Sequence, residues 1–276
     1  CALPPYTLSE ALRERLAAQT VAMAKALDVR GLINIQFAVK DDEIFVLEAN
    51  PRASRTVPFV AKAVGAPIAA IAAKIMAGIP LAQFDLSQAR PRRIAVKEAV
   101  FPFRRFLGVD PVLGPEMRST GEVMGWDDDF GAAFLKSQIA AGVNLPRSGQ
   151  VFVSVKDSDK PLVVEPVTRL IDMGFSIVAT GGTADYLAAE GLPVARINKV
   201  VEGQPHVVDA LINGEVQLVF NTTEGMQSLR DSASIRRTAV NRAIPYFTTL
   251  SASRASVQAI DALRTRNLTI RPLQSA

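Results

Sequence analysis

The sequence predicts an α/β protein in two parts, a mixed α+β part followed by a Rossmann-like part built on a parallel sheet. From residue 151 onward, short apolar runs alternate with helical patterns, which is typical of βαβ units. The earlier residues instead contain two strand patterns joined by turn residues. Between the parts, residues 142–150 are rich in Gly, Pro, Ser and Asn, so we expect two domains, 1–146 and 147–276.

The composition fits two ordinary domains and narrows the classes of function. The chain has 276 residues, of which 49% are apolar, and a net charge of +4 with a pI near 9.4, which favours anionic ligands. No Lys/Arg block interleaves with aromatic residues, so we predict no nucleic-acid binding. The single cysteine, Cys1, excludes an internal disulfide and fits a reducing compartment. Without a long apolar run or a signal peptide, we expect no membrane association and a cytoplasmic location.

The first part is expected to begin with a helix. Thr7 and Glu10 have the spacing of a capping box, and the helical pattern behind them reaches about Leu27. Asp127 to Asp129 predict the N-cap of a later helix, and a metal site is the less favoured alternative. The other expected elements are strands at residues 32–39 and 46–50, helices at 57–65 and 68–78, a connector at 81–91, strands at 95–103 and 120–125, and a helix at 130–141.

The predicted strand pair carries a candidate cation site. Glu48 and Asn50 are two residues apart, so both point to the same face of a strand. A three-residue loop around Asp41 and Asp42 would pair Lys40 with Ile44 and place Gln36 opposite Glu48. Three oxygen ligands on one face suit Mg²⁺, which usually also binds substrate phosphates.

Two guanidinium groups, Arg52 and Arg55, follow these ligands and suit phosphate or carboxylate. The alternative is a surface hairpin with a solvated Glu48.

The second part is predicted to be a parallel sheet. Its strands are expected at residues 151–155, 175–179, 194–197, 216–220 and 246–249, and its helices at 161–173, 182–190, 206–212, 234–243 and 254–265. Because ligands of such sheets bind beyond the carboxyl ends of the strands, the residues that follow each strand are the candidate site.

Polar residues collect at those strand ends. Thr180 to Thr183 join a strand to a helix through two glycines, whose backbone N–H groups can hold a phosphate. Lys160, Lys199 and the run Asn221 to Thr223 follow the other strands. We therefore predict a phosphate ligand, with an ordinary strand-to-helix turn as the alternative.

Two further features have competing interpretations. His206, the only histidine, follows a proline at an expected helix start and is predicted to cap or pack rather than to act as a base. Arg236 and Arg237 form either a phosphate clamp or a solvated helical face.

Several segments of the first part resemble one family. Residues 31–39 (GLINIQFAV), 48–59 (EANPRASRTVPF), 96–103 (VKEAVFPF) and 113–125 (LGPEMRSTGEVMG) resemble the carbamoyl-phosphate synthetase large chain, an ATP-grasp family. The resemblance implies that residues 1–146 are the C-terminal part of a carbamoyl-phosphate-forming ATP-grasp domain. Such a domain phosphorylates carbamate with MgATP, in pyrimidine and arginine biosynthesis.

The resemblance also assigns roles to the residues of the strand pair. Gln36, Glu48 and Asn50 would hold Mg²⁺ or Mn²⁺, with K⁺ as a further candidate cation, ATP would be the substrate, and the catalytic Arg52 and Arg55 would steady phosphate or carbamate charge. The glycine-rich lid and the adenine-binding lobe of the family have no counterpart in this sequence. We therefore expect a C-terminal piece of a larger chain that is inactive alone.

Residues 147–276 resemble the methylglyoxal-synthase-like domain, the regulatory end of the same large chain. In that family, uridylate (UMP) or inosinate (IMP) contacts the positions that match Ser154, Lys160, Thr180, Thr183, Lys199, Asn221, Thr222 and Thr223. The stand-alone synthase has a His-Asp pair where this chain has Lys156-Asp157, and a catalytic aspartate where it has Asn221 to Glu224. The resemblance therefore implies an effector-binding module rather than a lyase.

The family resemblance implies one more site and several partners. Glu98, Tyr246 and Thr248 match positions that bind ornithine, although Phe247 stands where a polar residue is expected and Glu98 could simply lie on an exposed strand. The expected partners are the remainder of the large chain, the glutamine amidotransferase small subunit and further copies in an oligomer. The alternative function is a non-catalytic regulatory module that only binds nucleoside monophosphates.

Overall fold

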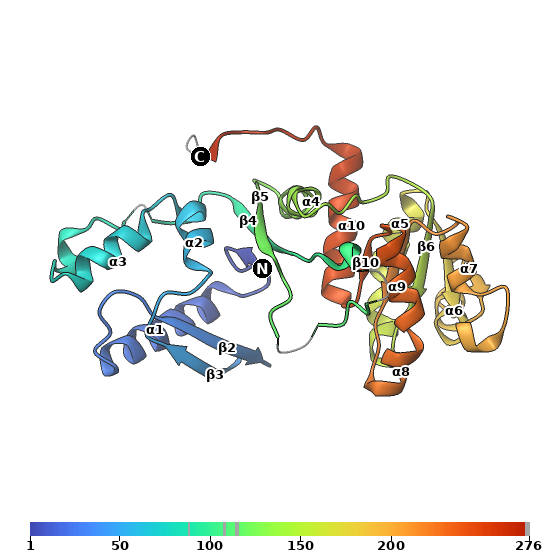
Figure 1. Cartoon of the computed structure of the whole chain (residues 1–276), viewed down its shortest axis with the longest axis horizontal. Helices are drawn as coiled ribbons and strands as arrows, with labels where there is room; N and C mark the ends of the chain where they lie inside the picture. The colour runs from blue at the N-terminus through green and yellow to red at the C-terminus, as the bar shows by residue number, and fades with distance from the viewer. Residues whose placement is uncertain (88, 107–108, 114–115, 274–276) are drawn as a thin grey trace. The chain divides into compact units, whose positions relative to one another are not determined.

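The computed structural model describes residues 1–87, 89–106, 109–113 and 116–273. The chain forms two compact units (Figure 1). The first contains the residues up to Ala95 together with those from Thr269 onward, and the second extends from Val96 to Leu268.

The first unit is a mixture of helices and a β-hairpin, as predicted. Its elements are β1 (Ala2–Leu3), α1 (Glu10–Ala26), β2 (Asn34–Lys40), β3 (Glu43–Asn50), α2 (Val57–Val64), α3 (Ile68–Met76) and a 3₁₀ turn, η1 (Leu81–Gln83). The predicted capping box of Thr7 and Glu10 is wrong. Ser9 caps α1, because its extended backbone brings Oγ to 3.3 Å from the amide nitrogen of Leu12.

The turn of the hairpin differs from the prediction. Lys40 pairs with Glu43, so the loop is the two residues Asp41 and Asp42 and not three residues. Both have positive φ, 51° and 62°, which is the conformation of a type I′ turn. This turn twists in the same sense as the strands, whereas the predicted loop would have paired Lys40 with Ile44.

The predicted pairing of Gln36 with Glu48 is nevertheless confirmed. An irregularity between the pairs formed by Gln36 and Phe37 shifts the register by one residue, so that Gln36 lies opposite Glu48 and Asn34 opposite Asn50. The shorter turn and the bulge compensate each other.

The helices α2 and α3 confirm the predicted helices at residues 57–65 and 68–78. Gly65 ends α2 with φ of 67°, in the left-handed region that glycine favours. Among the described residues no single helix is both long and apolar enough to cross a membrane. Of the helix pairs that the structure describes, one, α2 and α3, meets those criteria when taken together, with a bend of 115° at the junction.

The second unit begins with two strands and a helix. β4 (Ile94–Val100), which starts at the end of the first unit, is followed by the 3₁₀ turn η2 (Phe103–Arg105), β5 (Gly121–Asp127) and α4 (Phe130–Ala140). β4 and β5 are neighbours in one sheet. Asp129 caps α4 by accepting a hydrogen bond from the amide of Ala132 at 3.0 Å, so the predicted cap is confirmed.

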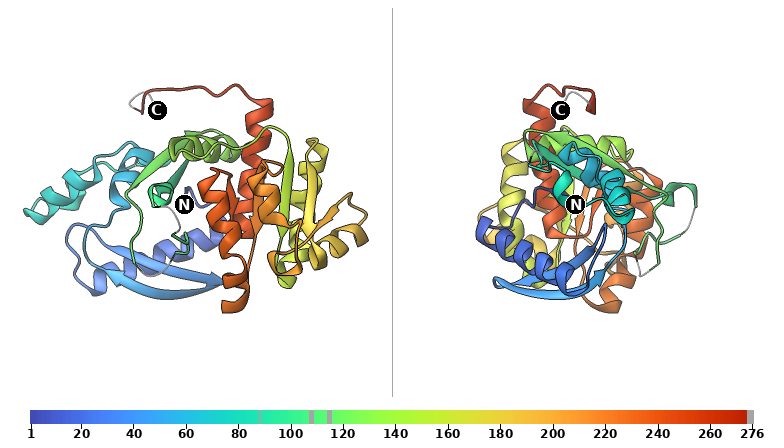
Figure 2. Two further views of the ribbon diagram at one scale, coloured as in Figure 1. Left: turned by 45° about the vertical axis from the view of Figure 1, so that its right-hand side comes forward. Right: turned by 90° about the vertical axis from the view of Figure 1, so that its left-hand side faces the viewer.

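The helix α4 approaches β5 so closely that only glycine fits at residue 125. A Cβ there would lie 1.9 Å from the carbonyl oxygen of Ala133 and 2.5 Å from the amide nitrogen of Ser137, both backbone atoms of α4. On its other side α4 packs against α10 (Leu250–Thr265), which lies beside it in Figures 1 and 2.

The remaining elements form the predicted parallel sheet. Its five strands lie in the order β10 (Tyr246–Phe247), β9 (Leu218–Asn221), β6 (Gln150–Ser154), β7 (Ser176–Thr180) and β8 (Ala195–Ile197), and all neighbouring pairs are parallel. The helices are α5 (Lys160–Asp172), α6 (Gly181–Ala189), α7 (Val207–Ile212), α8 (Gly225–Asp231), α9 (Ala233–Asn241) and α10, with the 3₁₀ turns η3 (Asp157–Asp159) and η4 (Val200–Glu202). α8 lies outside the predicted helices.

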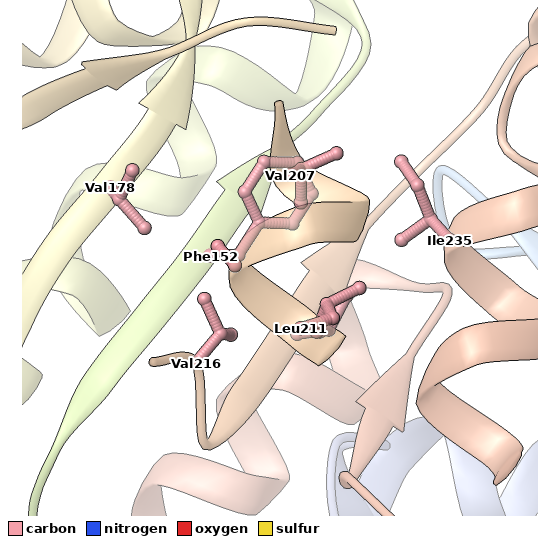
Figure 3. Close-up of a cluster of buried hydrophobic side chains, with 8 residues drawn as sticks. Phe152, Val178, Val207, Leu211, Val216 and Ile235 are labelled. Atoms are coloured by element: carbon pink, nitrogen blue, oxygen red, sulfur yellow. The ribbon is translucent and has the colours of Figure 1, made fainter. Parts of the chain in front are cut away.

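The core of this unit lies between the sheet and its helices. The middle of β6 is fully buried at Phe152, and α7 covers it with Val207 and Leu211 (Figure 3). Val178 from β7 and Ile235 from α9 complete the same cluster. Because the central strands are apolar on both faces, polar side chains are confined to the strand ends.

The predicted domain boundary between residues 146 and 147 lies in the loop that connects α4 to β6. α4 precedes this loop and α10 follows it, yet the two helices pack together. The division at residue 146 stays a prediction.

Candidate functional site

The candidate cation ligands lie on one face of the β2–β3 hairpin. Asn50 Nδ2 donates to Glu48 Oε1 at 2.9 Å, and Gln36 lies opposite Glu48 on the neighbouring strand. Glu48 and Gln36 are exposed and Asn50 is partly buried, so the oxygens of the three side chains can face a bound ion.

The donor set suits a hard cation but is incomplete. Glu48 contributes one carboxylate, and no group of three or more His, Cys, Asp or Glu side chains suited to a metal occurs in the described part of the chain. A Mg²⁺ or Mn²⁺ ion held by these oxygens would take its remaining ligands from water and phosphate, as Mg²⁺ commonly does. The metal assignment of these residues stays a prediction.

The two candidate arginines lie between β3 and α2. Arg52 and Arg55 are both exposed, and Arg52 Nη1 donates to the carbonyl of Ala53 at 3.0 Å. The backbone of this segment is held by Ser54, whose Oγ accepts from the amide of Thr56 at 3.2 Å. The guanidinium groups therefore follow directly after the oxygen ligands, and their catalytic role stays a prediction.

The carboxyl ends of β7, β6 and β9 bring the predicted phosphate ligands together. Ser154 ends β6, Thr180 ends β7 and Asn221 ends β9, and the three strands are neighbours. The hydroxyls of Ser154 and Thr180 are hydrogen-bonded across the strands at 2.9 Å. Thr183 Oγ1 accepts from the amide of Val155 at 3.2 Å, so the first turn of α6 is fixed against the end of β6.

The residues after β9 complete this edge. Thr222 Oγ1 accepts from the amide of Lys156 at 3.1 Å, and Thr223 follows it. Asn221 is 2% exposed, and within the described residues its Nδ2 has no hydrogen-bond partner of ordinary geometry, although the amide lies close enough to the Tyr246 hydroxyl to lower the pKa of Tyr246. A buried donor without an acceptor is costly, so this amide suits the oxygen of a ligand.

The Lys160 ammonium lies at the start of α6. It forms an ion pair with Asp157 at 2.7 Å, and a Cβ on Gly182 would lie 3.3 Å from its Nζ. The hydrogen bond and the charge of Lys160 lower the pKa of Asp157, and the charge of Lys199 lowers it further. Lys160 therefore lies next to the N-terminal end of α6, where the helix dipole also favours an anion, and Lys199 follows β8 at the carboxyl edge of the same sheet.

Sequence reasoning missed one cation at this edge. A Cβ on Gly181 would lie 2.7 Å from Nη2 of Arg196, so this guanidinium packs against the first residue of α6. Arg196 also lies 3.7 Å from Asp185, one turn along the same helix. Arg196 is part of the short strand β8, and no turn or motif in the sequence indicates that its side chain reaches the glycines.

The candidate ornithine ligands have separate partners. Glu98 accepts a hydrogen bond from Gln138 at 3.0 Å, and burial raises its pKa. Burial also raises the pKa of Tyr246 to about 12, while Arg236 and Asn221 lower it. Thr248 is exposed.

Phe247, which stands where a polar residue was expected, is 8% exposed and makes an edge-to-face contact with Phe220, with ring centroids 6.2 Å apart. The ornithine site stays a prediction.

The predicted capping role of His206 is confirmed by local contacts. His206 caps α7: its Nδ1 accepts from the amide of Asp209 at 3.4 Å, and the Asp209 carboxylate accepts from the amide of His206 at 2.9 Å. A cavity of about 270 Å³ beside them is lined by Asn198, His206 and Asp209, among others, and by none of the predicted phosphate ligands. We therefore do not assign it to the phosphate site.

Both halves of the chain match known families. Residues 2–84 match the ATP-binding domain of the carbamoyl-phosphate synthase L chain, and residues 162–248 match the MGS-like domain. Gly114 and Pro115, near the start of the segment LGPEMRSTGEVMG, lie outside the described residues.

Curated relatives match the chain from end to end. A carbamoyl phosphate synthase large chain of Brucella suis biovar 1 (strain 1330) is 56% identical over 99% of this chain and 24% of its own length. Large chains from Rhizobium meliloti (strain 1021) and Myxococcus xanthus (strain DK1622) are 55% and 52% identical over 100% and 99% of this chain. The chain spans about a quarter of the length of these relatives.

Proposed function

Because this chain belongs to the family of carbamoyl-phosphate synthase large chains, we propose that its second unit binds a nucleoside monophosphate as an allosteric effector. We propose that its hairpin serves the ATP-dependent phosphorylation of carbamate in the whole protein. The observation that supports the effector site most directly is the meeting of the ends of β6, β7 and β9 with the Lys160 ammonium at the start of α6.

The charges at this edge favour a phosphate. Lys160 and Lys199 are positive, the first turn of α6 adds unpaired backbone N–H groups, and Asp157 neutralises only part of the charge. The Thr180 and Thr183 hydroxyls and the Asn221 amide can bond phosphate or ribose oxygens. Uridylate and inosinate share the phosphate that this set would recognise, whereas free uridine lacks it.

Isothermal titration of uridylate, inosinate and uridine against the pure chain tests this site. Lys160→Ala should weaken uridylate binding about ten- to a hundredfold, because a bond to a charged group contributes about 1.5–3 kcal/mol. Lys199→Ala should weaken uridylate binding by about tenfold, at the lower end of that range, because the Lys199 side chain is more exposed than that of Lys160. Arg242→Gln is the matched control, since Arg242 follows α9 and precedes β10, at the opposite edge of the sheet. Equal affinities for uridine and uridylate would refute the phosphate site.

The hairpin supports a role in phosphoryl transfer only within a larger protein. Glu48, Gln36 and Asn50 would hold Mg²⁺ or Mn²⁺, and the metal would neutralise phosphate charge. Arg52 and Arg55 would orient the phosphate or carbamate. We expect no carbamoyl phosphate from the 276-residue chain with MgATP, bicarbonate and ammonia. The chain covers 24% of the length of its relative, and the glycine-rich lid and adenine-binding lobe that would position the γ-phosphate have no counterpart in its sequence.

Product formation by the isolated chain would contradict that expectation. A chain that binds nucleotides and makes no product fits both the proposal and the alternative of a purely regulatory module. The Glu48→Ala variant of a whole large chain distinguishes the proposal from the regulatory alternative, because only the proposal gives Glu48 a role in the reaction. We also propose that this segment acts together with the rest of a large chain and with a glutamine amidotransferase subunit, in an oligomer in the cytoplasm. Ornithine and K⁺ are the further ligands that we propose.

A further inference from the structure

Arg236 has the most unusual environment of the charged residues in the second unit. It lies in the middle of α9, and its side chain is 4% exposed, whereas the adjacent Arg237 is exposed. The structure therefore separates two residues that the sequence treats as one pair. A buried guanidinium needs a compensating charge close by, because removing it from water is costly.

That charge comes from Asp110, which is 126 positions earlier in the chain. Arg236 Nε donates to Asp110 Oδ1 at 2.7 Å and Nη2 donates to Oδ2 at 2.5 Å, which is the two-pronged geometry of a strong arginine–carboxylate pair. Asp110 lies in the connection between β4 and β5, within residues 109–113. The ion pair therefore ties this connection to a helix of the parallel-sheet domain.

The third guanidinium nitrogen of Arg236, Nη1, is buried. Within the described residues, Nη1 of Arg236 has no hydrogen-bond partner of ordinary geometry, and the same holds for Nδ2 of Asn221. Both side chains nevertheless lie close enough to the Tyr246 hydroxyl to stabilise its ionised form. Tyr246 pairs with Val219 on β9, two residues before Asn221 at the effector edge. The Arg236–Asp110 ion pair and the Tyr246 hydroxyl, which the side chains of Arg236 and Asn221 both approach, thus lie between Asp110 and the effector edge.

We propose that Arg236 is a positioning residue that couples the effector edge to the connection at residues 109–113. Through Tyr246 it orients the Asn221 amide, and through Asp110 it holds the connection. A ligand that supplies an acceptor to Asn221 changes the balance of donors around the Tyr246 hydroxyl, and the Arg236–Asp110 pair transmits this change. The inference rests on the proposed effector site, and it assigns a regulatory path to that site.

Linkage makes this coupling measurable from either end. If uridylate binding stabilises the connection by some factor, an intact connection must favour uridylate binding by the same factor, typically about fivefold or more. A merely structural ion pair would change the overall stability of the unit but would not make exchange in the connection depend on the ligand.

Hydrogen exchange of the full chain, with and without saturating uridylate, tests the proposal. In the wild type, amides of a peptide that covers residues 109–113 should exchange about fivefold or more slowly when uridylate is bound. Asp110→Asn should abolish the slowing of exchange by uridylate and should weaken uridylate binding by a similar factor. Arg236→Lys keeps the charge but cannot form the two-pronged pair, so it should behave in the same way and replaces Asp110→Asn if that variant fails to fold. Arg237→Gln, the control, should change neither quantity.

The possible results separate the two proposals. A wild-type chain that binds neither uridylate nor inosinate would refute the proposed function, and the coupling with it. If the wild type binds uridylate but exchange in the connection is unchanged, the effector site stands and the coupling is wrong. The coupling is also wrong if Asp110→Asn or Arg236→Lys retains the full ligand-dependent slowing.

Discussion

Replacing Gly125 by alanine should strongly destabilise the second unit, because β5 and α4 approach each other there through their backbones. The added Cβ would lie 1.9 Å from the carbonyl oxygen of Ala133 and 2.5 Å from the amide nitrogen of Ser137. To reach the 3.4 Å of ordinary van der Waals contact, the helix must move away by about 1.5 Å. It cannot do so freely, because its other side packs on α10.

The expected magnitude follows from this geometry. Overpacking of a close-packed interior costs about 1–3 kcal/mol, and the upper end applies because the clash is with backbone and not with a flexible side chain. A loss of about 3 kcal/mol lowers Tm by roughly 6–12 °C in a unit of this size. Gly121→Ala is a matched control on the same strand, since a Cβ there meets nothing within 4 Å.

Urea unfolding followed by tryptophan fluorescence is a suitable assay, because the single tryptophan, Trp126, is adjacent to the substituted residue. Its carbonyl also accepts a hydrogen bond from Lys136 of α4 at 3.2 Å, so its environment reports on this packing. We expect a lower midpoint for Gly125→Ala and an unchanged one for Gly121→Ala. Free energies of unfolding that agree within about 0.5 kcal/mol for the two variants would show that the helix accommodates the methyl group and that the reasoning is wrong.

Three further predictions follow from other contacts. Asp127 forms an ion pair with Lys136 at 2.6 Å, and although burial opposes the shift, the hydrogen bond and charge of Lys136 lower the pKa of Asp127. The ion pair therefore contributes its full stability above the unfolded pKa near 3.8, and this contribution is lost as the pH falls through the lower folded pKa. Asp127→Asn should reduce the loss of stability between about pH 5 and pH 3, as measured by urea titrations. A fragment of residues 96–268 should unfold at a higher urea concentration than residues 150–268, because only the longer one covers α10 with α4; equal midpoints would support a boundary at residue 146. In a whole large chain, Glu48→Ala should abolish carbamoyl-phosphate formation, and near-normal turnover would overturn the metal assignment.

The parallel-sheet domain could be predicted in detail because its local signals agree with its long-range structure. Strands such as residues 150–154 are short apolar runs bounded by turn residues, and they are buried on both faces. Parallel strands end at the same edge, so the sequence alone indicates that Ser154, Thr180 and Asn221 meet. The glycines at the start of α6 support the same prediction.

The features that sequence reasoning missed depend on partners far away in the chain or on small shifts of register. The alternation of side chains along a strand does not reveal the bulge beside Gln36. The predicted turn was one residue too long, and the bulge compensates for this error, so the pairing of Gln36 with Glu48 was still correct. Arg236 and Arg237 look equivalent on a helix, and only the ion pair with Asp110 distinguishes them. Arg196 lies on a strand without any turn signal, so its approach to the glycines appears only in three dimensions.

The contact between α4 and α10 also implies a delay during synthesis, because α4 is made well before the helix that covers it. α4 ends at Ala140, and α10 begins about 110 residues later. At about 5–20 residues per second, a ribosome needs roughly 5–20 s to deliver the covering helix. During that interval the nascent chain presents the apolar side chains of α4, including Phe134 and Leu135, which are almost fully buried in the finished molecule. Nascent chains that stop before Leu250 should therefore be the ones that chaperones retain.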